Sequence, residues 1–98
     1  MAFIVRFNDD KSQLLKATKG VSFPEVLKHI SDGDLIADKP HHSRNRPNKR
    51  LYIVNINNYV WVVPYVINME KNEIFLKTIY PNSRFTDKYL KKGEDNGK

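Results

Sequence analysis

Histidine and basic side chains gather in two stretches of the sequence, and these residues could do chemistry. The first stretch holds His41, His42, Arg44, Arg46 and Arg50 within ten residues. The second stretch, near the C-terminus, holds Lys77, Arg84, Lys88 and Tyr89. Metal-free cleavage of RNA requires a base for the 2′-hydroxyl, cations for the charge that develops on the phosphate, and a proton donor for the leaving oxygen. Histidine, lysine, arginine and tyrosine side chains can meet all three requirements.

Other chemistries have less support in the sequence. The chain contains no cysteine, and the adjacent His41 and His42 point apart on an extended backbone, so they chelate a metal poorly. The sequence has no paired-carboxylate spacing, no glycine-rich phosphate loop and no motif around a nucleophilic serine. We therefore expect neither a metal nor another cofactor. A solvated loop with no function is the alternative interpretation of the two histidines.

The charge balance favours a polyanionic partner. The chain has 98 residues, a formal net charge of +6 and an isoelectric point of about 9.6. Such a surplus attracts nucleic acid or an acidic protein, although it also serves solubility alone. No apolar run approaches the roughly 18 residues that span a bilayer, and the N-terminus lacks the features of a signal peptide. We expect a single domain over residues 1–92, a polar tail over 93–98, a cytoplasmic location and no membrane contact.

Two apolar runs joined by Asn57-Asn58 are predicted to position several of these side chains. The runs "RLYIVNI" and "YVWVVPYVI" are rich in β-branched and aromatic residues, and asparagine tolerates the positive φ of a two-residue hairpin turn. This turn would place Arg50 opposite Tyr65, and Ile67 opposite Glu73 if a second hairpin follows. Alternation along the strands then assigns these side chains to one face: Arg50, Tyr52, Trp61, Tyr65 and Lys77.

The two faces of this predicted sheet differ in kind. One face is aliphatic, which suits burial under the two N-terminal helices, and it carries Leu51, Ile53, Val60, Val62, Pro64, Ile74 and Leu76. The other combines Tyr52, Trp61 and Tyr65 with cations, and aromatic rings beside cations suit stacked bases and phosphates. Ordinary packing, with partial cover by the last helix, is the alternative for Trp61 and Tyr52.

The remaining segments predict an α+β fold. Asn8 or Asp9 can begin a helix that Gly20 ends, and Ser22 and Glu25 are spaced as the capping box of a second helix. Residues 38–49 have no periodicity and are predicted to form a loop. Further strands are expected at 3–7 and 73–80, with a final helix from residue 82 or 83. The expected architecture is two N-terminal helices on a small antiparallel sheet of about four strands, with a C-terminal helix.

Three segments, in order, resemble BrnT-like toxins of bacterial type II toxin–antitoxin systems. "FNDDKSQLLKATKGVSFPEV" is similar to their opening strand, aromatic-x-Asp-x-x-Lys segment and "K-x-G-V-S-F-x-E" turn. "RPNKRLYIVNINNYVWVVPYV" and "EIFLKTIYPNSRFTDKYLKK" resemble the middle and the ending of an uncharacterised branch of that group. With the opening strand included, the resemblance covers roughly Phe3 to Lys92.

The resemblance implies a RelE-like fold, cleavage of RNA with or without the ribosome, and a cognate antitoxin that neutralises the toxin. Carried over by position, its candidate residues are Lys19, Arg50, Lys77, Arg84 and Tyr89. The sequence departs from the pattern at Arg46, which replaces a tyrosine, and at Asn58, which replaces a turn glycine. His42 has no counterpart.

These observations together predict an endoribonuclease toxin whose partners are RNA and an antitoxin. Its predicted catalytic residues are Arg50, Lys77, Arg84, His41, His42 and Tyr89. Its predicted RNA-binding residues are Lys19, Arg44, Arg46, Tyr52, Trp61, Tyr65 and Lys88. The alternatives are a non-catalytic basic module that binds a partner, and a ParE-like inhibitor of gyrase.

Overall fold

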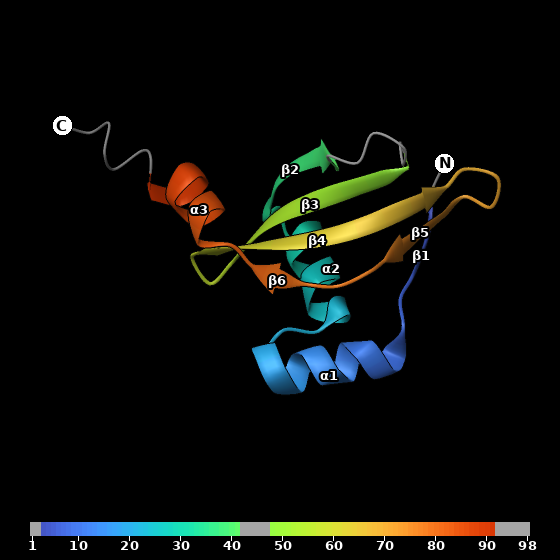
Figure 1. The fold of residues 1–98 in the computed structure, drawn as a ribbon, viewed down its shortest axis with the longest axis horizontal. Helices are drawn as coiled ribbons and strands as arrows, with labels where there is room; N and C mark the ends of the chain where they lie inside the picture. Colours follow the sequence, from blue (N-terminus) through green and yellow to red (C-terminus); the bar gives the residue numbers. More distant parts are fainter. Residues whose placement is uncertain (1–2, 42–47, 92–98) are drawn as a thin grey trace.

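The computed structural model describes residues 3–41 and 48–91. In that part of the chain the elements are β1 (Ile4–Arg6), α1 (Asp9–Lys19), α2 (Phe23–Ser31), β2 (Leu35–Pro40), β3 (Lys49–Ile56), β4 (Tyr59–Asn68), β5 (Glu73–Leu76), β6 (Tyr80–Pro81), α3 (Ser83–Thr86) and a π-helical segment, η1 (Asp87–Lys91). The helices α1 and α2 lie on one side of a sheet, and α3 lies beyond one end of β3 and β4 (Figure 1). The α+β prediction is therefore confirmed.

Local chemistry determines where the first two helices begin and end. The Asn8 side chain accepts a backbone N–H at the start of α1 at 2.8 Å. Gly20 ends that helix with φ 84°, a conformation that most residues other than glycine and asparagine adopt with strain. Ser22 and Glu25 form the predicted capping box, in which the Ser22 N–H donates to Glu25 Oε1 at 2.8 Å. No helix in the described ranges is long and apolar enough to cross a membrane.

The central hairpin has the predicted register. Asn57 and Asn58 both have positive φ, 55° and 65°, and they join β3 to β4. Arg50 lies opposite Tyr65, and the pairing continues from there to the turn. The turn chemistry alone was thus sufficient to align the two longest strands.

The sheet is larger than predicted, and it is mixed. It contains six strands in the order β1-β5-β4-β3-β2, with β6 also paired to β4, instead of the predicted four or so. β1 runs parallel to β5, so the sheet is not purely antiparallel. The predicted loop over residues 38–49 is wrong at both ends, because β2 extends to Pro40 and β3 begins at Lys49. β2 is an edge strand held by backbone hydrogen bonds to β3. Its sequence therefore lacks the alternation of apolar and polar residues by which a strand is predicted.

The predicted register between β4 and β5 is wrong by one residue. Asn68, not Ile67, lies opposite Glu73, and the shorter connection is closed by Asn72 with φ 53°. A shift of one residue moves every side chain of a strand to the other face. Leu76 therefore packs in the cluster of Tyr65 and not on the aliphatic face.

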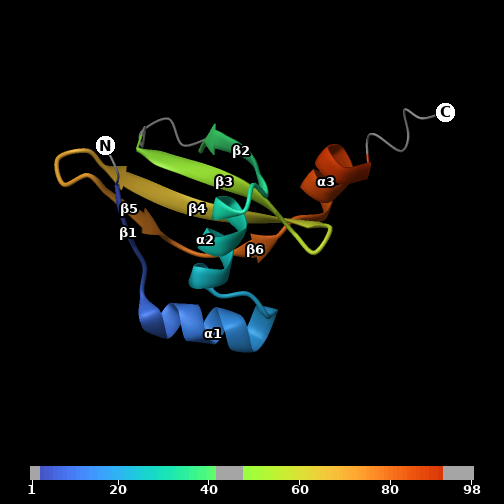
Figure 2. The ribbon, with the colours of Figure 1, turned by 180° about the vertical axis from the view of Figure 1, so that it is seen from behind.

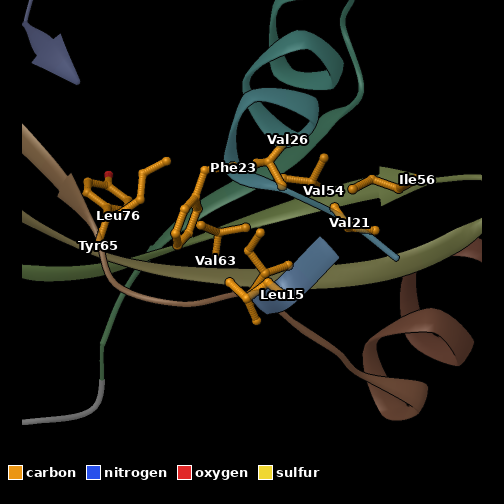
Figure 3. Packing of buried hydrophobic residues seen from close by; sticks show 10 residues of the cluster. Leu15, Val21, Phe23, Val26, Val54, Ile56, Val63, Tyr65 and Leu76 are labelled. Atoms are coloured by element: carbon orange, nitrogen blue, oxygen red, sulfur yellow. The ribbon is translucent and has the colours of Figure 1, made fainter. Parts of the chain in front are cut away.

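Each face of the sheet has its own core. We call the first the helix-covered face, and its strand residues include Arg50, Tyr52, Val54, Ile56, Trp61, Val63 and Tyr65. We call the second the open face, and its strand residues include Lys49, Leu51, Ile53, Val60, Val62, Pro64 and Val66. α2 lies behind the strands in Figure 1 and in front of them in Figure 2. Phe23, Val26 and Leu15 from α1 and α2 approach Val54 and Val63 of the sheet (Figure 3).

The prediction of which helices pack on which face of the sheet is therefore wrong. This difference matters for function, because it decides which side chains are accessible. The N-terminal helices cover the face with the tyrosines and the tryptophan. The aliphatic centre of the open face packs instead against residues of the C-terminal segment: Tyr80, Phe85, Tyr89 and Leu90. Both faces are apolar near the middle of the hairpin, so the alternation pattern alone could not tell which layer each helix would occupy. Beyond the C-terminal segment, the rest of the open face carries charged side chains.

Candidate functional site

Two lysines on the open face belong to β2 and β3, and His41 directly follows β2. Lys39 lies opposite Leu51, and strand alternation places Lys49 on the same face, two residues before Leu51. The His41 N–H donates to the Lys49 carbonyl at 3.0 Å, so the pairing of the two strands continues past the end of β2. Lys39, His41 and Lys49 therefore share one face at one end of the sheet.

Lys77 joins this group from the end of β5. Its Nζ lies 5.5 Å from the centre of the Phe75 ring. Phe75 lies opposite Val66, and Val66 lies opposite Lys49. Lys77 thus lies on the open face, and its backbone N–H donates to the Pro64 carbonyl at 2.8 Å. We call Lys39, His41, Lys49 and Lys77 the basic group.

The lysines of the basic group make no ion pair with any described residue. The ion pairs in the described ranges join Arg6 to Glu73, Lys16 to Glu25, Lys28 to Asp32, His29 to Asp34 and Arg50 to Asp38. Lys39 and Lys77 instead lie over aromatic rings, those of Phe85 and Phe75. Lys49 is half-buried on its strand. A cation in such a position is stabilised by an anion, so this surface suits an anionic ligand.

Two pockets on this side of the sheet meet at His41. The smaller, of about 100 Å³, is lined by His41, Lys49, Arg50, Pro64, Tyr65, Val66 and Lys77. The larger, of about 370 Å³, is lined by Lys39, Pro40, His41, Leu51, Tyr80, Asn82 and Phe85. The first is rich in cations, and the second combines a cation with two aromatic rings. Adjacent sites for a phosphate and a base require this combination.

A third pocket, of about 470 Å³, lies between α1 and the start of α2, away from the basic group. Its lining residues are Phe7, Asp9, Ser12, Gln13, Lys16, Ala17, Ser22 and Pro24. None of the predicted site residues is among them. Nor do three or more histidine, aspartate or glutamate side chains gather as a metal site within the described residues. The open face is therefore the stronger candidate for function.

Arg50 belongs to a separate polar network on the helix-covered face. Its Nε donates to Asp38 Oδ1 at 3.0 Å, and its Nη2 donates to the Asp38 carbonyl at 3.1 Å. The Tyr65 hydroxyl donates to the same Oδ1 at 2.6 Å, and its ring stacks on that of Tyr52 at 4.0 Å. Hydrogen bonds to Asp38 and Tyr65 raise the pKa of Arg50. The Asp38 carboxylate therefore already binds the guanidinium, and this ion pair explains how β3 accommodates a half-buried cation.

Burial dominates the environment of Tyr65. Only 2% of the surface of Tyr65 is exposed to solvent. This burial raises the pKa of Tyr65, and the hydrogen bond to Asp38 raises it further. A ring this deeply buried cannot stack on a base. Tyr52 and Trp61 are half-buried against the same cluster, beneath the N-terminal helices. Their position in this cluster agrees with the alternative interpretation of Tyr52 and Trp61, in which the rings serve packing.

The predicted common face of Arg50 and Lys77 is wrong. The register of β5 places Lys77 on the open face, whereas Arg50 belongs to the helix-covered face, although both line the smaller pocket. Arg84 is exposed near the start of α3 and lines none of the three pockets. These three cations therefore do not form the predicted centre.

The other predicted residues lie in several places. The Lys19 Nζ donates to the Ile79 carbonyl at 3.3 Å, on the side of the N-terminal helices. Lys88 lies over the ring of Tyr89 at 5.4 Å, and that ring meets Phe85 edge-on at 5.8 Å. The roles assigned to Arg84, Lys88 and Tyr89 stay predictions. His42, Arg44 and Arg46, and the predicted tail at 93–98, lie outside the described residues.

Sequence reasoning missed Lys49 and Lys39. The hairpin register that placed Arg50 on one face places its neighbour Lys49 on the other, so this lysine could have been identified from the sequence. Lys39 required knowledge that β2 pairs with β3. Phe85 and Asn82 could be placed only once the C-terminal segment was known to cover the open face.

Comparisons with known proteins identify no relative. No family model, no curated protein and no solved structure matches the chain. The geometry of the open face and the resemblance of three sequence segments are therefore what bears on its function.

Proposed function

We propose that the protein is a metal-independent endoribonuclease toxin with a RelE-like fold, which acts on cytoplasmic RNA. The observation that supports this most is the basic group, because four side chains in or directly after β2, β3 and β5 gather on one face beside two adjoining pockets. Neutralising phosphates with lysines releases counterions and favours RNA binding. The resemblance to BrnT-like toxins supports the same function independently.

The roles follow from the chemistry of each side chain. Lys49 and Lys77 bind the scissile phosphate in the smaller pocket and stabilise its developing negative charge. His41 lies where the two pockets meet, and imidazole is the side chain that most often transfers protons near neutral pH. Lys39 binds the neighbouring phosphate. This assignment replaces Arg50, which Asp38 already holds.

The cognate antitoxin would neutralise the protein by covering the same surface. An acidic segment of the antitoxin would compete with RNA for Lys39, Lys49 and Lys77, none of which pairs with a carboxylate in the described chain. Complementary charge gives such a partner fast association and specificity. Simple occlusion of the basic group is then sufficient for inhibition.

Incubation of the purified protein with cellular RNA, with and without ribosomes, tests this proposal. His41→Gln is expected to lower the cleavage rate about a hundredfold, because a proton-transfer group is lost. Lys49→Ala and Lys77→Ala are expected to lower it about tenfold or more. Lys28→Ala is the matched control, since Lys28 is exposed on α2 and pairs with Asp32.

Two results would contradict the proposal. The first is the absence of RNA cleavage under both conditions. The second is cleavage by the His41, Lys49 and Lys77 variants at the rate of the Lys28 control. RNA binding without cleavage would indicate the non-catalytic module instead, and a DNA-damage response on expression would indicate a gyrase inhibitor.

A further inference from the structure

The larger pocket has the character of a site for a planar ring. Its volume of about 370 Å³ falls within the range of small-ligand pockets, about 300–1,000 Å³. Phe85 and Tyr80 contribute aromatic surface, and Leu51 contributes aliphatic surface. The pocket adjoins the phosphate-binding lysines through His41, which lines both pockets. Aromatic surface beside a phosphate site is the usual arrangement for binding one nucleotide of a single strand.

Asn82 lines this pocket, and its amide has a fixed orientation. Its Oδ1 accepts the backbone N–H of Phe85 at 2.8 Å. A backbone N–H can only donate, so the atom facing it must be the oxygen, and the amide cannot flip. The Nδ2 group has no hydrogen-bond partner among the described residues, where every buried side-chain N or O atom has one. Nδ2 therefore reaches solvent as an oriented donor with no acceptor capacity.

We propose that this pocket is a base-selecting subsite, in which Phe85 stacks on an RNA base and Asn82 Nδ2 donates to a carbonyl oxygen of that base. The inference rests on the proposed binding of RNA to the open face. The selective group is the side-chain amide, not the backbone of the short helix α3. Lys39 lies 5.2 Å from the Phe85 ring centre, and its flexible chain moves to a phosphate when a base takes that place.

The chemistry of the donor predicts which bases are preferred. Uracil and guanine present carbonyl oxygens on the edges that single-stranded RNA exposes. Adenine accepts only through ring nitrogens, and its N1 and N7 both lie beside the N6 amino group, a donor that opposes the Nδ2 donor. An amide that could flip would offer either a donor or an acceptor and would discriminate poorly. The hydrogen bond to Phe85 removes that freedom, so the subsite favours uracil over adenine.

Binding of short 2′-O-methyl oligonucleotides, which resist cleavage through the 2′-hydroxyl, tests the subsite directly. Fluorescence anisotropy at one salt concentration compares oligouridine with oligoadenosine. The unmodified protein is expected to bind oligouridine about tenfold more tightly, since two opposed donors in place of a hydrogen bond at a polar site cost about that factor. Phe85→Leu is expected to weaken binding of both oligonucleotides about tenfold, because base stacking is lost.

Asn82→Asp is the decisive variant. The carboxylate still accepts the Phe85 N–H, so the start of α3 is kept, while the donor becomes an acceptor. The preference for uracil should disappear. Asn8→Asp is the matched control, because Asn8 caps α1 in the same way, away from the pocket. This control adds the same charge and should keep the preference.

The outcomes separate the subsite from the function on which it rests. Equal binding of the two oligonucleotides by the unmodified protein, or a preference that survives Asn82→Asp, would overturn the subsite and leave RNA binding intact. Failure to bind either oligonucleotide would overturn both proposals. Unchanged binding by a folded Phe85→Leu variant would also overturn the subsite, and circular dichroism establishes that the variant is folded.

Discussion

The two faces of one strand, β3, use their cations in opposite ways. Arg50 lies on the helix-covered face, where Asp38 binds its guanidinium and the Tyr65 hydroxyl donates to the same carboxylate. Lys49, the preceding residue, lies on the open face and makes no ion pair with a described residue. Adjacent cations thus differ in environment because strand alternation places them on opposite faces. A cation beside aromatic rings indicates a binding surface only when the part of the sheet on which it lies is known to be uncovered.

The largest expected effect concerns the two cores. Phe23 is fully buried between α2 and the sheet, whereas Phe75 on the open face is 39% exposed. Phe23→Ala is expected to lower the free energy of unfolding by about 3–5 kcal/mol, because it leaves a cavity. Phe75→Ala is expected to lower it by about 1 kcal/mol or less. Urea unfolding measures both, and equal losses would mean that the open face is covered around Phe75 as the other face is around Phe23.

The second effect tests the network around Arg50. Asp38→Asn removes the negative charge that accepts hydrogen bonds from Arg50 and Tyr65, and it is expected to lower the free energy of unfolding by about 1–2 kcal/mol. Asp32→Asn breaks an exposed pair with Lys28 and should change it by about 0.5 kcal/mol or less. Thermal unfolding of both variants provides the comparison. A loss no larger than that of the Asp32 variant would mean that the network contributes nothing.

The third effect separates the neighbouring cations Lys49 and Arg50. Lys49→Ala removes a phosphate contact, so the slope of log affinity for single-stranded RNA against log salt should become shallower by about 0.7. Arg50→Ala should leave this slope unchanged while lowering stability, because its charge is already paired with Asp38. Titrations at several salt concentrations measure the slopes. A shallower slope for the Arg50 variant alone would reverse the assignment of the two faces.

The smallest effect is a dependence of stability on alkaline pH. Burial raises the pKa of Tyr65, and the hydrogen bond to Asp38 adds to this. An unfolded tyrosine loses its proton near pH 10, so its contribution to stability is complete below that pH and falls as the pH rises further. Tyr65→Phe should therefore lose stability less steeply than the unmodified protein above pH 10. The urea midpoint of each protein is measured against pH. An equally steep fall of the midpoint above pH 10 in both proteins would contradict this account.

Short-range chemistry made several elements predictable. The capping box of Ser22 and Glu25, the left-handed Gly20 and the Asn57-Asn58 turn depend on residues a few positions apart, and the structure contains all of them. Such features need no knowledge of the rest of the fold. The α+β class followed from them.

Long-range features were not predictable in the same way. A turn closed by Asn72 shifted β5 by one residue and so moved Lys77 to the open face. Both faces of the sheet have an apolar centre, so the sequence pattern does not determine which face the N-terminal helices cover. They pack on the face that contains Tyr65. The basic group of the candidate site exists only after both choices are made, so its composition differs from the predicted set.

Lysine footprinting tests the central claim most directly. Acetylation followed by mass spectrometry measures the reactivity of each lysine with and without single-stranded RNA. If RNA binds the open face, Lys39, Lys49 and Lys77 should lose reactivity, while Lys11 and Lys28 on the N-terminal helices keep theirs. Protection of Lys11 and Lys28, with Lys49 and Lys77 unchanged, would contradict the account.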